Sequence, residues 1–135
     1  MVQSADDDVL VFTRHSPESR RAQALRRAGV KIVQARGRSG KPDLRAALEA
    51  LGKRDVLMLL VEAGARLNAA ALDAGVVDKL FLFYAPRFAG PGGLPMLGAR
   101  KSKLHITGTM QKLNLRQFGP DFAVEGYLRD VYRDH

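Results

Sequence analysis

Two short apolar runs without polar interruption most constrain the fold of this 135-residue chain. Residues Val56–Val61 read Val-Leu-Met-Leu-Leu-Val, and Leu80–Ala85 form a similar run that Pro86 closes. A strand with one face in water alternates apolar and polar side chains, whereas a strand covered on both faces does not. We therefore expect two buried strands, the first of them a central parallel strand.

Two further strands and a helix are expected earlier in the chain. Val9–Thr13 and Val30–Ala35 are short and rich in β-branched residues. Between them, Ser16 followed by proline is typical of a helix start, and a glycine follows Ala28. The spacing predicts a helix over Pro17–Ala28 with Ser16 as its N-cap.

The remaining segments continue the alternation of strand and helix. Asp43 is expected to cap a helix that Gly52 closes, and Ala65–Ala74 is predicted to form another. Leu104–Leu115 and Phe122–Leu128 have strand character and are joined by a Gly-Pro-Asp turn. The order predicts a single α/β domain over residues 1–135. We expect a mostly parallel sheet flanked by helices, with an antiparallel strand pair at one edge.

The composition excludes several classes of protein. The chain has no cysteine, which excludes disulfides, thiol nucleophiles and cysteine-bound metals. No apolar run approaches the ~20 residues that span a bilayer, and the acidic first residues are unlike a signal peptide. We expect a cytoplasmic protein without a membrane partner.

The positive charge is concentrated in one segment. Residues 14–54 hold 12 Lys and Arg but 3 Asp and Glu, a net charge of +9, whereas the rest of the chain carries −1. This segment has no aromatic residue to stack on bases. We interpret it as the solvent face of two helices that also suits phosphate-bearing small molecules, and we do not expect a nucleic-acid partner.

The candidate binding site is the junction between the run Val56–Val61 and the next predicted helix. Glu62 follows the run, Gly64 allows close approach of a ligand to the backbone, and Arg66 lies in the first helical turn. Free N–H groups at a helix start suit a pyrophosphate. Two readings stay open, because many such junctions bind nothing and Glu62 is also suited to capping the helix. The three histidines show no metal-ligand spacing, and no metal site is expected.

A longer pattern around this junction resembles a known family. It consists of Leu60–Leu67 (Leu-Val-Glu-Ala-Gly-Ala-Arg-Leu), Ala71–Leu80, Tyr84–Gly90, and the closing segments Phe118–Phe122 and Glu125–Leu128. Together they resemble the reductase domain of the bacterial riboflavin-biosynthesis deaminase/reductase, which has a dihydrofolate-reductase-like fold. The resemblance extends over most of the chain.

The resemblance implies an NADPH-dependent reductase. Its reaction converts 5-amino-6-(5-phosphoribosylamino)uracil, a phosphorylated pyrimidine, to the ribitylamino form, with hydride supplied by the cofactor. Glu62 matches the family glutamate that contacts substrate. The family positions that hold the cofactor's phosphates correspond to Gly64, Ala65, Arg66, Leu67 and Asn68. The resemblance identifies no catalytic proton donor in this chain.

The chain departs from the family pattern in three places. Ala63 replaces a glycine, Lys79 replaces a glutamate at an expected surface position, and the family's first strands have no counterpart. Without those strands, Val56–Val61 would expose an apolar edge. We therefore expect either a partner chain that covers this edge in a homodimer, or an N-terminally incomplete domain that is a fragment of a longer product. Two alternatives stay open: a related oxidoreductase with another substrate, and a non-catalytic scaffold that assembles through this edge.

Overall fold

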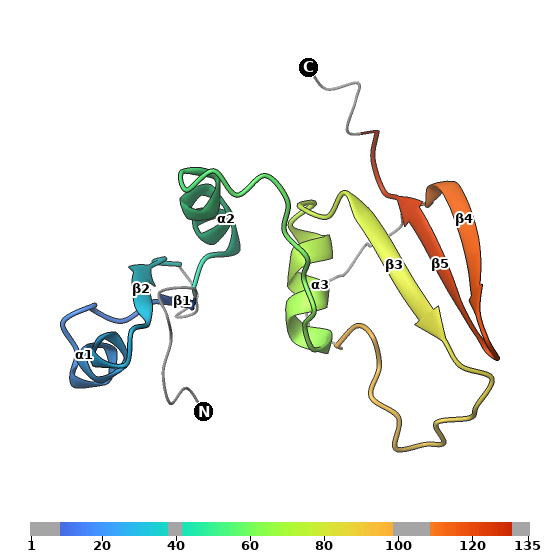
Figure 1. Ribbon diagram of the computed structural model, residues 1–135, viewed down its shortest axis with the longest axis horizontal. Coiled ribbons are helices and arrows are strands. Elements are labelled where there is room, and N and C mark those ends of the chain that lie inside the picture. Colours follow the sequence, from blue (N-terminus) through green and yellow to red (C-terminus); the bar gives the residue numbers. More distant parts are fainter. Residues whose placement is uncertain (1–8, 38–41, 99–108, 131–135) are drawn as a thin grey trace. The chain divides into compact units, whose positions relative to one another are not determined.

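The computed structural model describes residues 9–37, 42–98 and 109–130 of the chain (Figure 1). The chain divides into two compact units, Met1–Leu60 and Val61–His135. We call them the N-terminal unit and the C-terminal unit. The sequence predicts a single domain, and the two units are described in turn.

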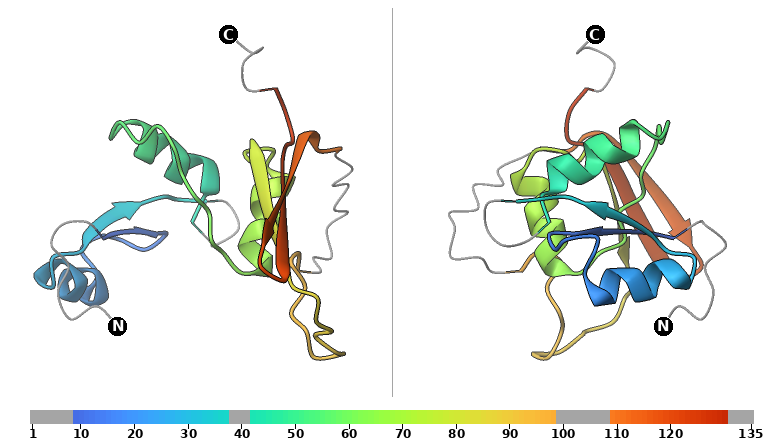
Figure 2. Two further views of the ribbon diagram at one scale, coloured as in Figure 1. Left: turned by 45° about the vertical axis from the view of Figure 1, so that its right-hand side comes forward. Right: turned by 90° about the vertical axis from the view of Figure 1, so that its left-hand side faces the viewer.

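The N-terminal unit is a β-α-β crossover followed by a second helix. Strands β1 (Leu10–Thr13) and β2 (Lys31–Gln34) pair in parallel along their whole length. Helix α1 (Arg20–Arg27) connects them, and α2 (Leu44–Gly52) follows. The two helices lie on opposite faces of the strand pair (Figure 2). Small apolar side chains form the buried core, namely Ala22, Val30, Ala35 and Ala47.

The predicted start of α1 at Pro17 is wrong by one helical turn. The Ser16 carbonyl accepts a hydrogen bond from the Ser19 amide at 3.1 Å, and the Ser16 hydroxyl accepts one from the Glu18 amide at 3.1 Å. Ser16 and Pro17 therefore form a turn before the helix. Ser19 is the N-cap, and its side chain accepts from the Ala22 amide. A serine serves equally well in a turn and at a cap, so the sequence did not separate the two serines.

The described residues of the C-terminal unit, 61–98 and 109–130, form one helix and an antiparallel sheet. Helix α3 (Ala65–Asp73) precedes β3 (Lys79–Tyr84), and β4 (Gln111–Phe118) and β5 (Asp121–Tyr127) form a hairpin. The strand order is β3-β5-β4, and both pairings are antiparallel. The prediction of a mostly parallel sheet is therefore wrong: among the described residues, only β1 and β2 pair in parallel. The predicted antiparallel pair is confirmed, although 104–108 of its first segment lie outside the described residues.

Helix α3 lies along one face of this sheet (Figures 1 and 2). Leu80 and Leu82 of β3 are half-buried, whereas Phe83 on the opposite face is 66% exposed. Side chains alternate between the two faces of a strand, so one face is covered and the other is open to solvent. Ala69, Ala71 and Ala123 are buried in this unit.

The segment Val56–Val61 forms no strand in the structure. Its side chains are exposed, with Leu57 at 98% and Leu60 at 77%. The expectation of a central buried strand is wrong here. A strand needs hydrogen-bond partners from neighbouring strands on its edges. Among the described residues no strand pairs with this segment.

No described helix combines the length and the apolar character needed to cross a membrane.

Candidate anion-binding site at the start of α3

The start of α3 leaves backbone donors unused. Gly64 is the N-cap and offers no side chain to the first turn. The amides of Leu67 and Asn68 donate to the Gly64 carbonyl at 3.0 and 3.2 Å. Within the described part of the chain, no acceptor receives the amides of Ala65 and Arg66. These two N–H groups and the positive end of the helix dipole favour an anion at this position.

Gly64 itself is required neither by its backbone conformation nor by packing. Its φ of −79° and ψ of 167° are open to any residue. A Cβ built on Gly64 would meet no atom of the described residues within 4 Å. The space beside the first turn of α3 is therefore open, which a bound group at the helix start needs.

The charged side chains of this junction are exposed and available. Glu62 and Arg66 are both exposed, and neither makes an ion pair or side-chain hydrogen bond with the described residues. The capping role considered for Glu62 is not seen, since α3 has no side-chain cap hydrogen bond. Glu62 supplies two acceptor oxygens for hydroxyl or ammonium groups, and Arg66 supplies donors that suit phosphate.

The other two predicted residues of the site differ in what their side chains do. Leu67 is 44% exposed and contributes apolar surface and its backbone. The Asn68 side chain is already engaged, because its Nδ2 donates to the Met96 carbonyl at 3.1 Å. The structure therefore brings Gly64, Ala65 and Arg66 together at one helix end, and turns Asn68 toward a loop.

Sequence reasoning did not identify Met96 and Gly98 as neighbours of the site. The Gly98 amide donates to the Ala65 carbonyl at 2.9 Å, so both residues contact the first two turns of α3. The segment Gly90–Pro95 precedes them in the sequence. Its glycines and prolines indicated a loop, but no local pattern indicated where the loop returns.

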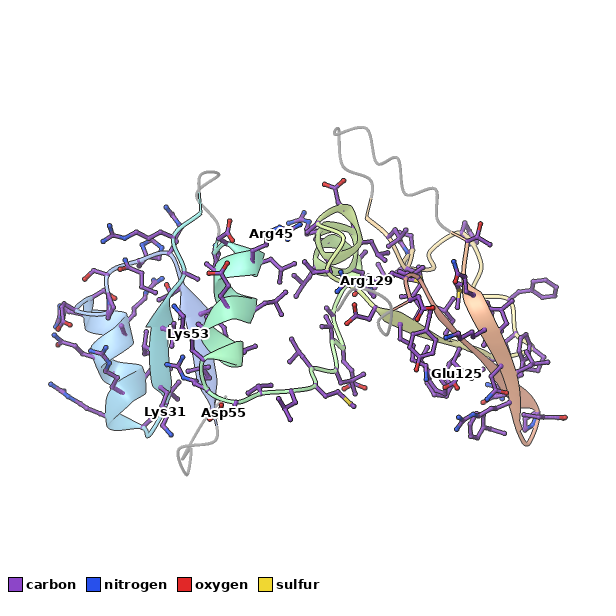
Figure 3. The ribbon with its side chains drawn as sticks, turned by 90° about the horizontal axis from the view of Figure 1, so that it is seen from above. Lys31, Arg45, Lys53, Asp55, Glu125 and Arg129 are labelled. Carbon is purple, nitrogen blue, oxygen red and sulfur yellow. The ribbon has the colours of Figure 1, made fainter. Side chains whose placement is uncertain are left out.

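A second charged cluster lies on β3, β4 and β5. Glu125, labelled in Figure 3, lies on β5. It accepts from Lys79 Nζ at 3.3 Å, Arg116 Nη2 at 3.2 Å and Asn114 Nδ2 at 3.3 Å. Partial burial by itself raises the pKa of Glu125. The hydrogen bonds from Lys79 and Asn114 and the positive charges of Arg116 and Lys79 together lower it by more, so that the pKa of Glu125 lies below its usual value. The cluster is internally satisfied, and we assign it to sheet stability. Lys79 is at the surface, as predicted.

Metal ligands do not gather in the described residues. No group of three or more His, Asp or Glu side chains is placed to hold an ion there.

Comparisons with known proteins relate this geometry to other chains. The sequence model described as the RibD C-terminal domain matches residues 1–124. The riboflavin biosynthesis protein RibD of Actinobacillus pleuropneumoniae is 30% identical over 90 residues, covering 67% of this chain and 24% of the relative. RibD of Escherichia coli is 36% identical over 87 residues, covering 63% of this chain and 23% of the relative. The chain thus spans about a quarter of these relatives.

Two solved structures share the fold. A pyrimidine reductase-like protein from Corynebacterium diphtheriae matches with a TM-score of 0.71 and 29% identity, covering 90% of this chain and 50% of that one. RibD of Acinetobacter baumannii matches with a TM-score of 0.69 and 24% identity, covering 90% and 31%. About 90% of this chain therefore shares the fold of these two structures. The expected dihydrofolate-reductase-like fold stays a prediction.

Proposed function

Because the chain belongs to the RibD C-terminal domain family, we propose that it binds NADPH and reduces 5-amino-6-(5-phosphoribosylamino)uracil to the ribitylamino form. The family and its link to riboflavin biosynthesis are given by the comparisons. The cofactor, the substrate and the activity of this chain are our proposal. The single observation that supports it is the uncapped glycine start of α3.

The residues at this helix start fit a phosphate-bearing cofactor. The amides of Ala65 and Arg66 are free donors, the Arg66 side chain adds a positive charge, and Gly64 leaves the approach open. These residues would hold the phosphates, with Leu67 beside them as apolar surface. When bound, NADPH supplies the hydride that reduces the C1 carbon of the ribosyl group. The protein contributes binding, orientation and charge.

Glu62 is the residue that we assign to the substrate. It lies two residues before the N-cap of α3, is exposed, and has no partner in the described chain. A carboxylate at this position accepts hydrogen bonds from the hydroxyl and amino groups that the substrate carries. Its role is binding and orientation, and no proton donor is assigned.

Thermal denaturation with added nucleotide tests cofactor binding. Saturating NADPH, at about 100 times its Kd, should stabilise the folded chain by about 2.7 kcal/mol and raise the Tm by several degrees. NADH lacks the 2′-phosphate and should raise the Tm less. The absence of a shift with either nucleotide at millimolar concentration would contradict the proposal.

Glu62→Gln separates substrate binding from cofactor binding. The variant should keep the Tm shift with NADPH and lose turnover of the pyrimidine, followed by the absorbance of the reduced nicotinamide. Glu49→Gln, at an exposed position of α2, is the matched control and should keep both. Loss of the NADPH shift in Glu62→Gln would show that the residue acts on the cofactor instead.

One observation favours a second candidate function, a non-catalytic domain that assembles through Val56–Val61. This apolar segment is exposed, and no strand formed by residues 9–37, 42–98 and 109–130 pairs with it. Leu57→Lys and Leu60→Lys should weaken assembly through this segment, including the expected homodimer. Light scattering would measure the molar mass of the assembly. Assembly without any response to NADPH would favour the scaffold over the reductase.

A further inference from the structure

A long loop returns to the start of α3 and is attached there by two hydrogen bonds. Residues 85–98 follow β3 without forming a helix or strand. At their end, Asn68 Nδ2 donates to the Met96 carbonyl at 3.1 Å, and the Gly98 amide donates to the Ala65 carbonyl at 2.9 Å. Figure 1 shows this loop, coloured yellow to orange, running from β3 to the lower end of α3. The loop is thus attached beside the free amides.

The attachment is a close approach between two backbones. A Cβ built on Gly98 would lie 3.4 Å from the Ala65 carbonyl carbon and 3.5 Å from its Cβ and oxygen. An alanine fits at this distance, whereas the branched carbons of valine would extend further into Ala65. The space at position 98 therefore sets how closely the loop sits on the helix.

The attachment uses a side of α3 that leaves the anion-binding donors free. Ala65 and Asn68 are three residues apart and so lie on one face of the helix. The Ala65 and Arg66 amides point along the helix axis beyond its first residue, as helix-start amides do. The loop therefore lies beside these donors and bonds to neither of them.

We propose that Asn68 is a positioning residue: its side-chain amide fixes Met96–Gly98 against α3, and the loop forms one wall of the cofactor phosphate site. This inference rests on the proposed function. It changes the role that the family resemblance implies for Asn68, because the side chain acts through the loop and does not contact the cofactor. A donor is essential there, since the Met96 carbonyl only accepts.

Three variants of the full chain test the assignment. Asn68→Ala removes the donor, Gly98→Val pushes the loop from Ala65 without removing a side-chain donor or a charge, and Gly98→Ala is the matched control. Loss of one such hydrogen bond should weaken NADPH binding about tenfold. We expect this loss in Asn68→Ala and Gly98→Val, with NADPH binding measured by titration, and unchanged affinity in Gly98→Ala.

Limited trypsin digestion reports the loop independently of any ligand. Arg87 is exposed and is the basic residue within 85–98, so cleavage after it, read by mass spectrometry, measures loop release. Asn68→Ala and Gly98→Val should be cut several times faster than the parent and Gly98→Ala. Unchanged cleavage in both would overturn the attachment.

The combined results separate the possible outcomes. Faster cleavage with unchanged NADPH affinity would overturn the positioning role. Weaker NADPH binding in Asn68→Ala alone, with Gly98→Val behaving like the parent, would show direct contact between Asn68 and the cofactor and would also overturn it. If the parent chain itself fails to bind NADPH, the proposed function fails, and the role of the loop as a wall of that site falls with it, while the digestion still decides whether Asn68 holds the loop.

Discussion

Helices α2 and α3 each have nine residues and begin in different ways. At α2, Asp43 Oδ1 accepts a hydrogen bond from the Ala46 amide at 2.9 Å. At α3, Gly64 occupies the same N-cap position and accepts nothing through a side chain. One first-turn amide of α2 is thus satisfied by a side chain, whereas no side chain of the described residues caps α3, and the proposed function assigns the donors of α3 to a bound anion. The comparison distinguishes a helix end capped by a side chain from one that, under the proposed function, binds a phosphate.

The largest expected effect comes from making α3 begin as α2 does. In Gly64→Asp the new carboxylate would accept from the first-turn amides and repel the phosphates of NADPH. We expect NADPH affinity to fall about a hundredfold, which corresponds to about 2.7 kcal/mol, measured by titration. Helix stability should rise by a few tenths of a kcal/mol.

Gly52→Asp, on α2, is the control for added charge. Gly52 also has no atom within 4 Å of a built Cβ and no left-handed φ, so the substitution is tolerated. It should bind NADPH as the parent does. Parent-like affinity in Gly64→Asp would mean that the anion is held elsewhere.

Removing the side-chain cap of α2 is the converse change, and its effect should be smaller and limited to the stability of the fold. Asp43→Ala removes the cap and should lower the free energy of unfolding by about 1 kcal/mol, measured by urea denaturation followed by circular dichroism. NADPH affinity should stay at the parent value. Asp43→Asn keeps an acceptor and should lie close to the parent. A loss of NADPH affinity in Asp43→Ala would break the division between the two helix starts.

The smallest expected effect is a loss of stability in acid. It extends the comparison to Glu125, a carboxylate of the C-terminal unit that serves stability as Asp43 does. The pKa of Glu125 is lower in the folded chain than in the unfolded chain, where a glutamate has a pKa of about 4.3. The stability that its ionised form contributes is therefore present above that unfolded value and is lost as pH falls through the folded pKa. The Tm difference between the parent and Glu125→Gln should be small at neutral pH and should shrink in acid. A difference that grows as pH falls would contradict the assignment.

Local patterns predicted the elements that depend on nearby residues. Asp43 was expected as an N-cap and is confirmed, because a cap needs only an acceptor and an amide three residues away. Strands β1, β2 and β3 lie within the predicted segments apart from the first residue of β3, Lys79. The glycine start of α3 was also expected, and the structure adds that the amides of Ala65 and Arg66 have no acceptor among the residues that it describes.

Features that depend on distant residues were not predictable from local patterns. The run Val56–Val61 has the composition of a buried strand, but its pairing depends on a neighbour that its own residues do not specify. The loop attachment at Asn68 joins residues 28 apart. Lys112 adopts a φ of 51° at a β-bulge, which a lysine in a strand sequence does not suggest.

The glycine at the start of α3 also means that the residue found at position 64 can report whether helix stability or ligand binding has been selected. Serine or aspartate there would give a more heat-resistant helix at no steric cost. Lineages propagated at high temperature without need for the bound ligand should therefore exchange this glycine for a residue with an acceptor. Lineages that depend on the ligand should keep the weaker helix. Deep sequencing of position 64 after such laboratory evolution would reveal which demand had governed the chain.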